Sequence, residues 1–250
     1  MQRKRPCSYF SDADLRDVME SMSFAEVEKD GFAVIPDVLG RHELSLILRK
    51  LEEAHLPHSR AGIRHLMSHA DVAALARDRR LLRIACEILG GDAIPFRATL
   101  FDKSPDANWL VVWHQDTALP LRERKEAPGW GPWSAKNGIT YAHAPAHVLD
   151  RIIALRVHFD VSTGPAEQNG GLRVLPGTHK LGVLTDDEVF RWSAEIAAAE
   201  CFAAQGSVLA MRPLLIHSSS KSQIEAPRRV LHLEYASSMA LEDGLELAMA

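Results

Sequence analysis

The chain has 250 residues, of which 46% are hydrophobic and 25% are charged, and its formal net charge at pH 7 is −4. These values are typical of a globular protein with a well-buried core, so we interpret residues 1–250 as a single domain. The negative net charge argues against nucleic acid or an anionic membrane surface as a partner. No window reaches the ~18 apolar residues of a membrane span, and no apolar stretch follows the basic N-terminus as in a signal peptide.

Three cysteines, Cys7, Cys86 and Cys201, are too few and too widely spaced for a disulfide framework or a zinc motif. We therefore expect them to be reduced and structural, which fits a cytoplasmic protein. The composition leaves the oligomeric state open between a monomer and a homodimer.

The N-terminal third of the chain is predicted to be mostly helical, with one short strand. Acidic residues after Ser11 suit the first turn of a helix. In two later segments, apolar residues recur at helical spacing and form one apolar stripe each. The predicted helices include residues 23–29, 42–54 and 81–89, and the strand covers 32–35. We expect these helices to support a sheet rather than to carry chemistry.

From about residue 93 the pattern changes to short strands separated by Gly, Pro and Asn, which predicts a β core over 93–236. The predicted strands are 94–101, 109–113, 152–161, 172–175, 208–211 and 228–235. A helix is expected at 185–199, away from the active site. We expect residues 241–250 to form a frayed tail, with a short interface helix as the alternative.

His114 and Asp116 follow the apolar run 109–113, so both are expected at the end of a strand. Side chains two residues apart point to the same face of a strand, so both can reach one metal ion. His217, after the apolar run 214–216, supplies a third ligand. Two histidines and one carboxylate form the facial set that binds iron(II) and leaves positions open for oxygen and a cosubstrate. A His-x-Asp pair alone is often accidental, but the three groups together predict an iron site.

Arg228 begins the predicted strand 228–235. If this strand pairs antiparallel with the strand at 206–211, Arg228 comes to lie beside the metal. A guanidinium offers a planar fork of donors that suits a carboxylate. A 2-oxo acid with a second carboxylate could therefore bind the metal through its keto acid group and the guanidinium of Arg228 through its distal carboxylate.

At this point the chain resembles the phytanoyl-CoA dioxygenase family of iron(II)- and 2-oxoglutarate-dependent oxygenases. The resemblance covers about residues 24–235 and rests on Trp113-His114-Gln115-Asp116, the segment from Asn169-Gly170-Gly171-Leu172 to Pro176-Gly177-Thr178-His179, His217, Arg228 and an opening segment at 30–39. The implied fold is a double-stranded β-helix, a jelly-roll sandwich of two antiparallel sheets with helices packed outside.

The resemblance also implies roles for single residues. His114, Asp116 and His217 match the iron ligands, and Arg228 matches the residue that binds the distal carboxylate of 2-oxoglutarate. Lys103 and Ser219 match a lysine and a hydroxyl position near this cosubstrate. The implied reaction uses Fe(II), 2-oxoglutarate and O2 to hydroxylate a C–H bond of a small-molecule metabolite, with release of succinate and CO2. Related halogenases lack the carboxylate ligand, so the presence of Asp116 favours oxygen transfer.

The long connection at 117–147 is the main irregular stretch, and loops of this length are usually functional or disordered. Its aromatic residues argue against disorder, so we expect a lid that forms part of the substrate pocket. The alternative is a loop folded on the surface of the sandwich and anchored by tryptophans. The candidate substrate contacts are Gln115, Thr117, Trp130, Tyr141, His143 and Arg156.

Arg156 lies on a predicted central strand, and a buried arginine needs a partner. That partner is left open between a substrate anion, 2-oxoglutarate, and a protein carboxylate such as Asp160 or Glu234. Trp109 and Trp113 are expected in sheet packing. No motif names the substrate.

Two other interpretations of the chain stay open. A cupin-type metalloenzyme that does not use 2-oxoglutarate would keep the three metal ligands but leave Arg228 without a purpose. A catalytically silent β-helix protein used for binding would have no chemical need for all four residues.

Overall fold

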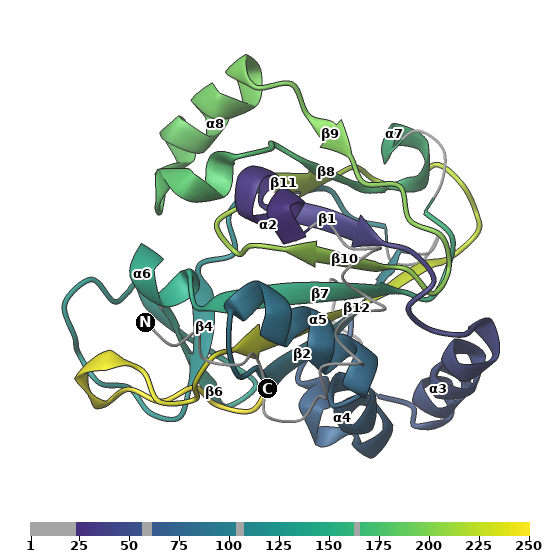
Figure 1. The fold of residues 1–250 in the computed structure, drawn as a ribbon, viewed down its shortest axis with the longest axis horizontal. Helices are drawn as coiled ribbons and strands as arrows, with labels where there is room; N and C mark the ends of the chain where they lie inside the picture. Colours follow the sequence, from purple (N-terminus) through teal and green to yellow (C-terminus); the bar gives the residue numbers. More distant parts are fainter. Residues whose placement is uncertain (1–23, 57–61, 104–107, 163–165) are drawn as a thin grey trace.

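The computed structural model describes residues 24–56, 62–103, 108–162 and 166–250. Cys7 and the helix expected after Ser11 lie outside the described residues. Within them, two antiparallel sheets pack into a jelly-roll sandwich with helices on the outside (Figure 1). The expected fold class is therefore confirmed.

The larger sheet holds five strands in the order β1, β10, β7, β12, β2, and every neighbouring pair is antiparallel. The strands are β1 (Phe32–Ile35), β10 (Val208–Met211), β7 (Ile152–His158), β12 (Arg228–Ala236) and β2 (Ile94–Lys103). We expected the strands at 208–211 and 228–235 to pair with each other, and this was wrong, because β7 lies between them.

Helices cover one face of this sheet and leave the other face to the interior of the sandwich. They are α2 (Phe24–Asp30), α3 (Arg41–Glu53), the 3-10 turn η1 (Leu66–Ser68), α4 (Ala70–Ala76) and α5 (Arg79–Leu89). Leu231, Leu233 and Tyr235 of β12 pack into the apolar core beneath the helices. Because side chains alternate along a strand, Arg228, His232 and Glu234 point the other way, into the sandwich.

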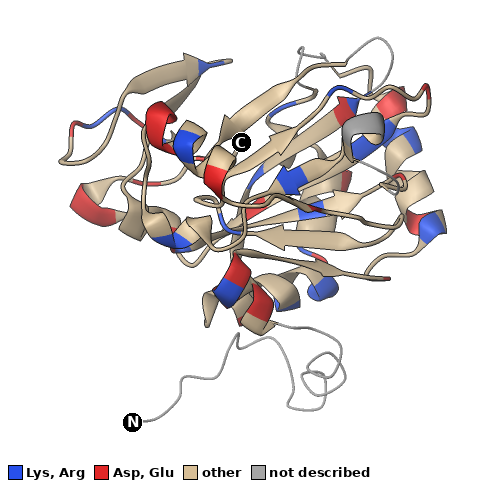
Figure 2. Cartoon of the chain, turned by 90° about the horizontal axis from the view of Figure 1, so that it is seen from above, with Lys and Arg blue, Asp and Glu red and all other residues tan. Residues whose placement is uncertain are grey.

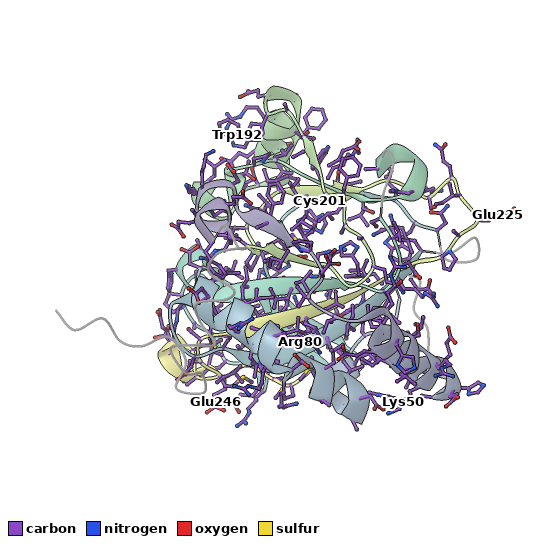
Figure 3. All side chains as sticks on the ribbon, turned by 45° about the vertical axis from the view of Figure 1, so that its right-hand side comes forward. Lys50, Arg80, Trp192, Cys201, Glu225 and Glu246 are labelled. Carbon is purple, nitrogen blue, oxygen red and sulfur yellow. The ribbon has the colours of Figure 1, made fainter. Side chains whose placement is uncertain are left out.

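The smaller sheet has the order β3, β11, β8, β9. Its strands are β3 (Val111–His114), β11 (His217–Ser219), β8 (Leu172–Val174) and β9 (Ala199–Glu200), with α7 (Ala166–Asn169) and η2 (Thr178–Leu181) on either side of β8. Helix α8 (Asp186–Glu195) packs on this sheet, where Trp192 joins a cluster with Trp113 and Ile216 (Figures 1 and 3). The helix expected at 185–199 is thus present on the side away from the larger sheet.

Residues 117–147 are not irregular, contrary to our expectation. They contain a three-stranded sheet of β4 (Ala118–Leu121), β6 (Ile139–His143) and β5 (Trp133–Lys136), followed by α6 (Ala146–Leu149). Asn137 and Gly138 join β5 to β6 with positive φ angles of 50° and 80°, as a two-residue Asn-Gly hairpin requires. Trp130 packs with Leu119 and Leu121, which agrees with the alternative of tryptophan anchors. Movement of this segment as a lid stays a prediction.

The C-terminal segment is not frayed. Leu247 is fully buried and pairs with Leu121, and the Ala250 amide donates a hydrogen bond of 2.8 Å to the Phe96 carbonyl. The segment, which includes η3 (Glu242–Gly244), therefore packs between β2 and β4. The expectation failed because the anchors of the tail lie far from it in the sequence.

The cysteines differ from each other. Cys86 is disulfide-bonded, whereas Cys201 is free and buried beside the interior of the sandwich (Figure 3). The expectation that all three cysteines are reduced is therefore wrong for Cys86. None of the described helices is long and apolar enough to cross a membrane.

Candidate metal centre

Three side chains from two neighbouring strands converge at one edge of the smaller sheet. His114 at the end of β3 is the register partner of His217 at the start of β11, and Asp116 follows two residues after His114. The Nε2 atoms of His114 and His217 lie 3.7 Å and 3.5 Å from the two carboxylate oxygens of Asp116. All candidate ligand atoms lie within 4.8 Å of one another. This spacing is small enough for one ion to contact all three groups.

Backbone carbonyls orient both histidine rings. The Nδ1 atom of His114 lies 2.9 Å from the Val112 carbonyl, and Nδ1 of His217 lies 2.9 Å from the Leu215 carbonyl. A carbonyl can only accept, so each Nδ1 carries the proton and donates it. Each Nε2 therefore presents a lone pair toward Asp116, as metal-bound histidines held by an outer carbonyl do.

Electrostatics keeps two of the three groups in the form that binds metal. Burial would raise the pKa of Asp116, but His217 and His114 outweigh it and hold that pKa well below its usual range. Burial lowers the pKa of His217 to about 4, against the attraction of Asp116. An ionised carboxylate and a neutral imidazole are the ligand forms.

Gln115, between the two ligands, is a structural residue. Its Nε2 donates to the carbonyls of Gly182 and Leu214 at 2.9 and 2.8 Å, and its Oε1 accepts from the Leu184 amide at 2.9 Å. With these three bonds it ties the turn before Asp116 to the segment that leads into β11. The side chain of Gln115 is thus engaged within the protein, and its role as a substrate contact stays a prediction.

The motif Pro176-Gly177-Thr178 holds the residue that precedes His217 in the chain. Thr178 is 1% exposed, and its hydroxyl donates to the Leu175 carbonyl at 2.7 Å and accepts from the Ile216 amide at 3.0 Å. The Leu175 amide in turn donates to the Ile216 carbonyl at 2.9 Å. This motif fixes the residue immediately before His217.

A cavity of about 550 Å³ opens beside the three ligands. It is lined by both sheets and by the segment before β3. The lining residues are Arg64, Phe101, Lys103, Trp109, Leu110, Val111, Val112, His114, Asp116, Arg156, Leu172, His217, Ser219 and Arg228. The structure thus brings the three candidate ligands together with Arg228, Lys103, Ser219 and Arg156.

Arg228 is a buried cation that forms no salt bridge with a carboxylate of the described residues. It is 5% exposed, and its Nε has no hydrogen-bond partner. Asp160 binds the neighbouring Arg229 instead, with contacts of 2.8 and 2.9 Å. Burial lowers the pKa of Arg228 to about 10, so the guanidinium stays charged near neutral pH. A buried charge of this kind needs a counter-ion.

Lys103 is the register partner of Arg228 on β2. Its ammonium donates to the Ser219 hydroxyl and to the Ser220 carbonyl, and the Ser219 hydroxyl donates to the Gly170 carbonyl at 2.9 Å. Burial, with the nearby Arg228 and Arg156 charges, lowers the pKa of Lys103 to about 7. This end of the cavity is strongly basic.

Several predicted substrate contacts are engaged elsewhere. The hydroxyl of Thr117 lies 2.7 Å from Nδ1 of the exposed His143, and the Tyr141 hydroxyl lies 2.9 Å from Nε2 of His65. Trp130 belongs to the apolar core beneath the three-stranded sheet of β4, β6 and β5. None of these four residues lines the cavity.

Other lining residues were not anticipated. Trp109, expected in sheet packing, lines the cavity with the Lys103 ammonium 5.5 Å from its ring centroid. Leu110 and Val112 are exposed on the same edge strand segment. Polar residues at alternating positions of two strands could have indicated which face of the larger sheet lines the interior. They are Arg97, Thr99 and Lys103 on β2 and Arg228, His232 and Glu234 on β12.

The jelly roll thus brings two histidines and one carboxylate, a set that could hold a metal ion, to a cavity that also contains a buried arginine. The chain belongs to the phytanoyl-CoA dioxygenase family, whose model matches residues 27–230. It is also similar to an ectoine dioxygenase of Streptomyces avermitilis, with 26% identity over 169 residues, or 61% of this chain. The matched region is 49% of that relative, so the chain spans about half its length.

Solved structures show the same fold. EctD from S. alaskensis with bound Fe has a TM-score of 0.63 at 16% identity, covering 95% of this chain and 79% of that one. HygX from Streptomyces hygroscopicus with nickel and 2-oxoglutarate bound has a TM-score of 0.61 at 17% identity, covering 93% and 89%. The α-ketoglutarate-dependent carbocyclase SnoK from nogalamycin biosynthesis has a TM-score of 0.66 at 15% identity, covering 92% and 88%.

Proposed function

We propose that the protein is an iron(II)- and 2-oxoglutarate-dependent dioxygenase that hydroxylates a C–H bond of a small-molecule metabolite. One oxygen atom of O2 enters the product hydroxyl, and the other enters the succinate formed from 2-oxoglutarate with loss of CO2. The observation that carries the proposal is the placement of Arg228. This cation, which forms no salt bridge within the described part of the chain, lines the same cavity as the three ligand side chains.

His114, Asp116 and His217 would hold iron(II) on one side, because both Nε2 atoms and the carboxylate converge and the cavity opens beside them. Arg228 would bind the distal carboxylate of 2-oxoglutarate through its guanidinium fork. Lys103 and Ser219 would add positive charge and a hydroxyl at the same end. The bound iron and 2-oxoglutarate supply the oxidising chemistry, while these residues orient the cosubstrate and limit side reactions.

Support also comes from relatives that differ in reaction. The ectoine dioxygenase is similar to the chain in sequence, and HygX with nickel and 2-oxoglutarate bound and the α-ketoglutarate-dependent carbocyclase SnoK share its fold. Hydroxylation is the outcome that we propose for this chain. We further propose a monomer or homodimer in the cytoplasm, a compartment in which the disulfide at Cys86 is unusual.

The test is an anaerobic titration of the iron(II)-loaded protein with 2-oxoglutarate, followed by visible absorption. We expect a saturable charge-transfer band, and we expect Arg228→Gln to weaken 2-oxoglutarate binding by at least about tenfold, the loss of a charge-assisted hydrogen bond. Arg229→Gln is the matched control, since this neighbour on the same strand is bound by Asp160 on the opposite face.

The other interpretations give different outcomes. A metalloenzyme that does not use 2-oxoglutarate would bind iron without developing the band. A silent binding protein would form no succinate under air with any substrate. Either result in iron-replete protein would overturn the proposal.

A further inference from the structure

We propose that Arg156 binds a carboxylate of the substrate, so that the natural substrate is an anionic small molecule. This inference rests on the proposed function and adds a substrate class to it. Arg156 is the one member of our predicted substrate contacts that lines the cavity.

Arg156 lies on the inner face of β7 in the middle of the larger sheet, and it is only 7% exposed. Its only hydrogen bond within the described chain joins NH1 to Nδ1 of His232 at 3.2 Å, and its Nε has no partner. Neither protein carboxylate that we considered binds it directly. Asp160 binds Arg229, and Glu234 lies beyond His232. No other described carboxylate forms a salt bridge with Arg156, so its charge needs a ligand.

A buried row of polar side chains holds the Arg156 guanidinium in place. Because Nδ1 of His232 accepts from Arg156, its Nε2 carries the proton and donates to Glu234 at 3.2 Å. The same Oε1 atom of Glu234 also accepts from Arg97. The guanidinium carbon of Arg156 also lies 5.3 Å from the centroid of the Phe101 ring. These contacts fix the group without neutralising it, which is how a specific anion subsite is preorganised.

Arg156 and Arg228 are attached at different points on the inner face of the larger sheet, although the charge of Arg156 still acts on Arg228 and Lys103. Arg156 is opposite His232 in the register, four residues along β12 from Arg228. Four residues of a strand span about 13 Å. Arg228 shares its end of the cavity with Lys103 and Ser219, whereas Arg156 sits among His232 and Phe101. One arginine therefore suits the cosubstrate and the other suits a second anion.

The charge balance of the cavity points to the same conclusion. Among the lining residues, Arg64, Arg156 and Arg228 carry three positive charges, and Lys103 adds a fourth when it is protonated, against the single negative charge of Asp116. Iron(II) and dianionic 2-oxoglutarate would together add no net charge. At least one positive charge thus stays uncompensated beside the position of the substrate. At the surface, the exposed Arg64 lines the cavity, while acidic and basic residues are interspersed over the described residues (Figure 2).

The test uses protein loaded with zinc(II), which takes the same types of ligand but has no redox chemistry, and saturated with 2-oxoglutarate. Acetate and benzoate are titrated by calorimetry, each against its uncharged amide, acetamide or benzamide. We expect at least one acid to bind about tenfold or more tightly than its amide, as for a charge-assisted hydrogen bond. Arg156→Gln should remove this preference and Arg156→Lys should retain part of it, with the surface variant Arg151→Gln as the control.

In the same proteins, 2-oxoglutarate is titrated separately. We expect Arg156→Gln to leave its affinity within about twofold, whereas Arg228→Gln weakens it by about tenfold or more. Equal losses in the two variants would make Arg156 a cosubstrate residue and overturn the inference. Equal binding of acids and amides to the wild-type protein would also overturn it, even if Arg156→Gln failed to fold. Failure of 2-oxoglutarate itself to bind would instead reject the proposed function.

Discussion

The rings of His114 and His217 lie 4.2 Å apart, centroid to centroid, across the pair of strands β3 and β11. The register of these two strands therefore sets the distance between two of the three candidate ligands. A metal bound by both histidines would connect the edge strand β3 to β11 as an additional cross-link. Metal binding and the stability of this sheet are consequently linked.

Removal of the metal should destabilise the protein. At a free metal concentration a hundredfold above the dissociation constant, we expect iron(II) to add about 2.7 kcal/mol to the free energy of unfolding. Anaerobic denaturant titrations with iron(II) or with a chelator measure this difference. Asp116→Ala should abolish it, and His147→Ala, at the surface, should preserve it. A metal effect of equal size in Asp116→Ala would show that the ion binds elsewhere.

The Thr178 hydroxyl is expected to stabilise the approach to His217. Thr178→Val leaves the buried Ile216 amide without its acceptor, so we expect a loss of about 1–3 kcal/mol in the free energy of unfolding and weaker metal binding. Thr178→Ser, which restores the hydroxyl, should recover most of both. Thr185→Val removes only the N-cap of α8 and should cost about 1 kcal/mol without changing metal affinity.

A side chain at Gly170 should be strongly destabilising. It has a φ of 66°, and a Cβ there would lie 3.0 Å from the Ser220 carbonyl oxygen and 3.1 Å from the Ser222 amide nitrogen. Gly90 has a similar φ of 68° but open space around it. We expect Gly90→Ala to cost about 1–2 kcal/mol from the backbone alone, and Gly170→Ala to cost clearly more and to weaken 2-oxoglutarate binding. Equal losses of stability in denaturant titrations would contradict the packing argument.

Features that depend on neighbours in the sequence could be predicted. The apolar run before His114 and the two-residue spacing to Asp116 placed both side chains on one strand end, and the helical stripes of α3 and α5 gave those helices within two residues. The strand order could not be predicted, because nothing local shows that β7 separates β10 from β12. The buried C-terminus was missed for the same reason.

For two features that we did not predict, the sequence does contain a local pattern. Asn137-Gly138 between short β-rich segments is a hairpin pattern. It indicated the hairpin of β5 and β6 in the three-stranded sheet, which we interpreted as an irregular loop. The alternation of Arg228, His232 and Glu234 indicated that the inner face of β12 is polar. What the sequence cannot show is the pairing of Glu234 with Arg97, because this depends on the register between β12 and β2.

The buried pair of Arg97 and Glu234 should be costly to break. Both side chains are largely inaccessible, and Arg97 also donates to the Ala118 carbonyl at 2.8 Å. Glu234→Gln leaves the guanidinium uncompensated, so we expect a loss of roughly 3–5 kcal/mol in the free energy of unfolding. Glu246→Gln in the exposed pair with Arg122 should cost less than about 1 kcal/mol. Similar losses in the two variants, measured by denaturant unfolding, would contradict this account.

The affinity for 2-oxoglutarate should fall as the pH rises, because of Lys103. Burial lowers the pKa of its ammonium to about 7 in the ligand-free protein, so that it loses its positive charge above this pH. A bound dianion favours the charged form and raises that pKa, and binding then takes up a proton between the two values. The affinity should therefore decrease by up to about tenfold per pH unit above about pH 7 and level off below it.

Calorimetric titrations of the zinc(II)-loaded protein in buffers of different ionisation enthalpy measure both the affinity and the proton uptake. Lys103→Met should bind more weakly at low pH and show a flat profile, while the surface variant Lys29→Met should follow the wild type; parallel profiles for Lys103→Met and the wild type would assign the pH dependence to another group.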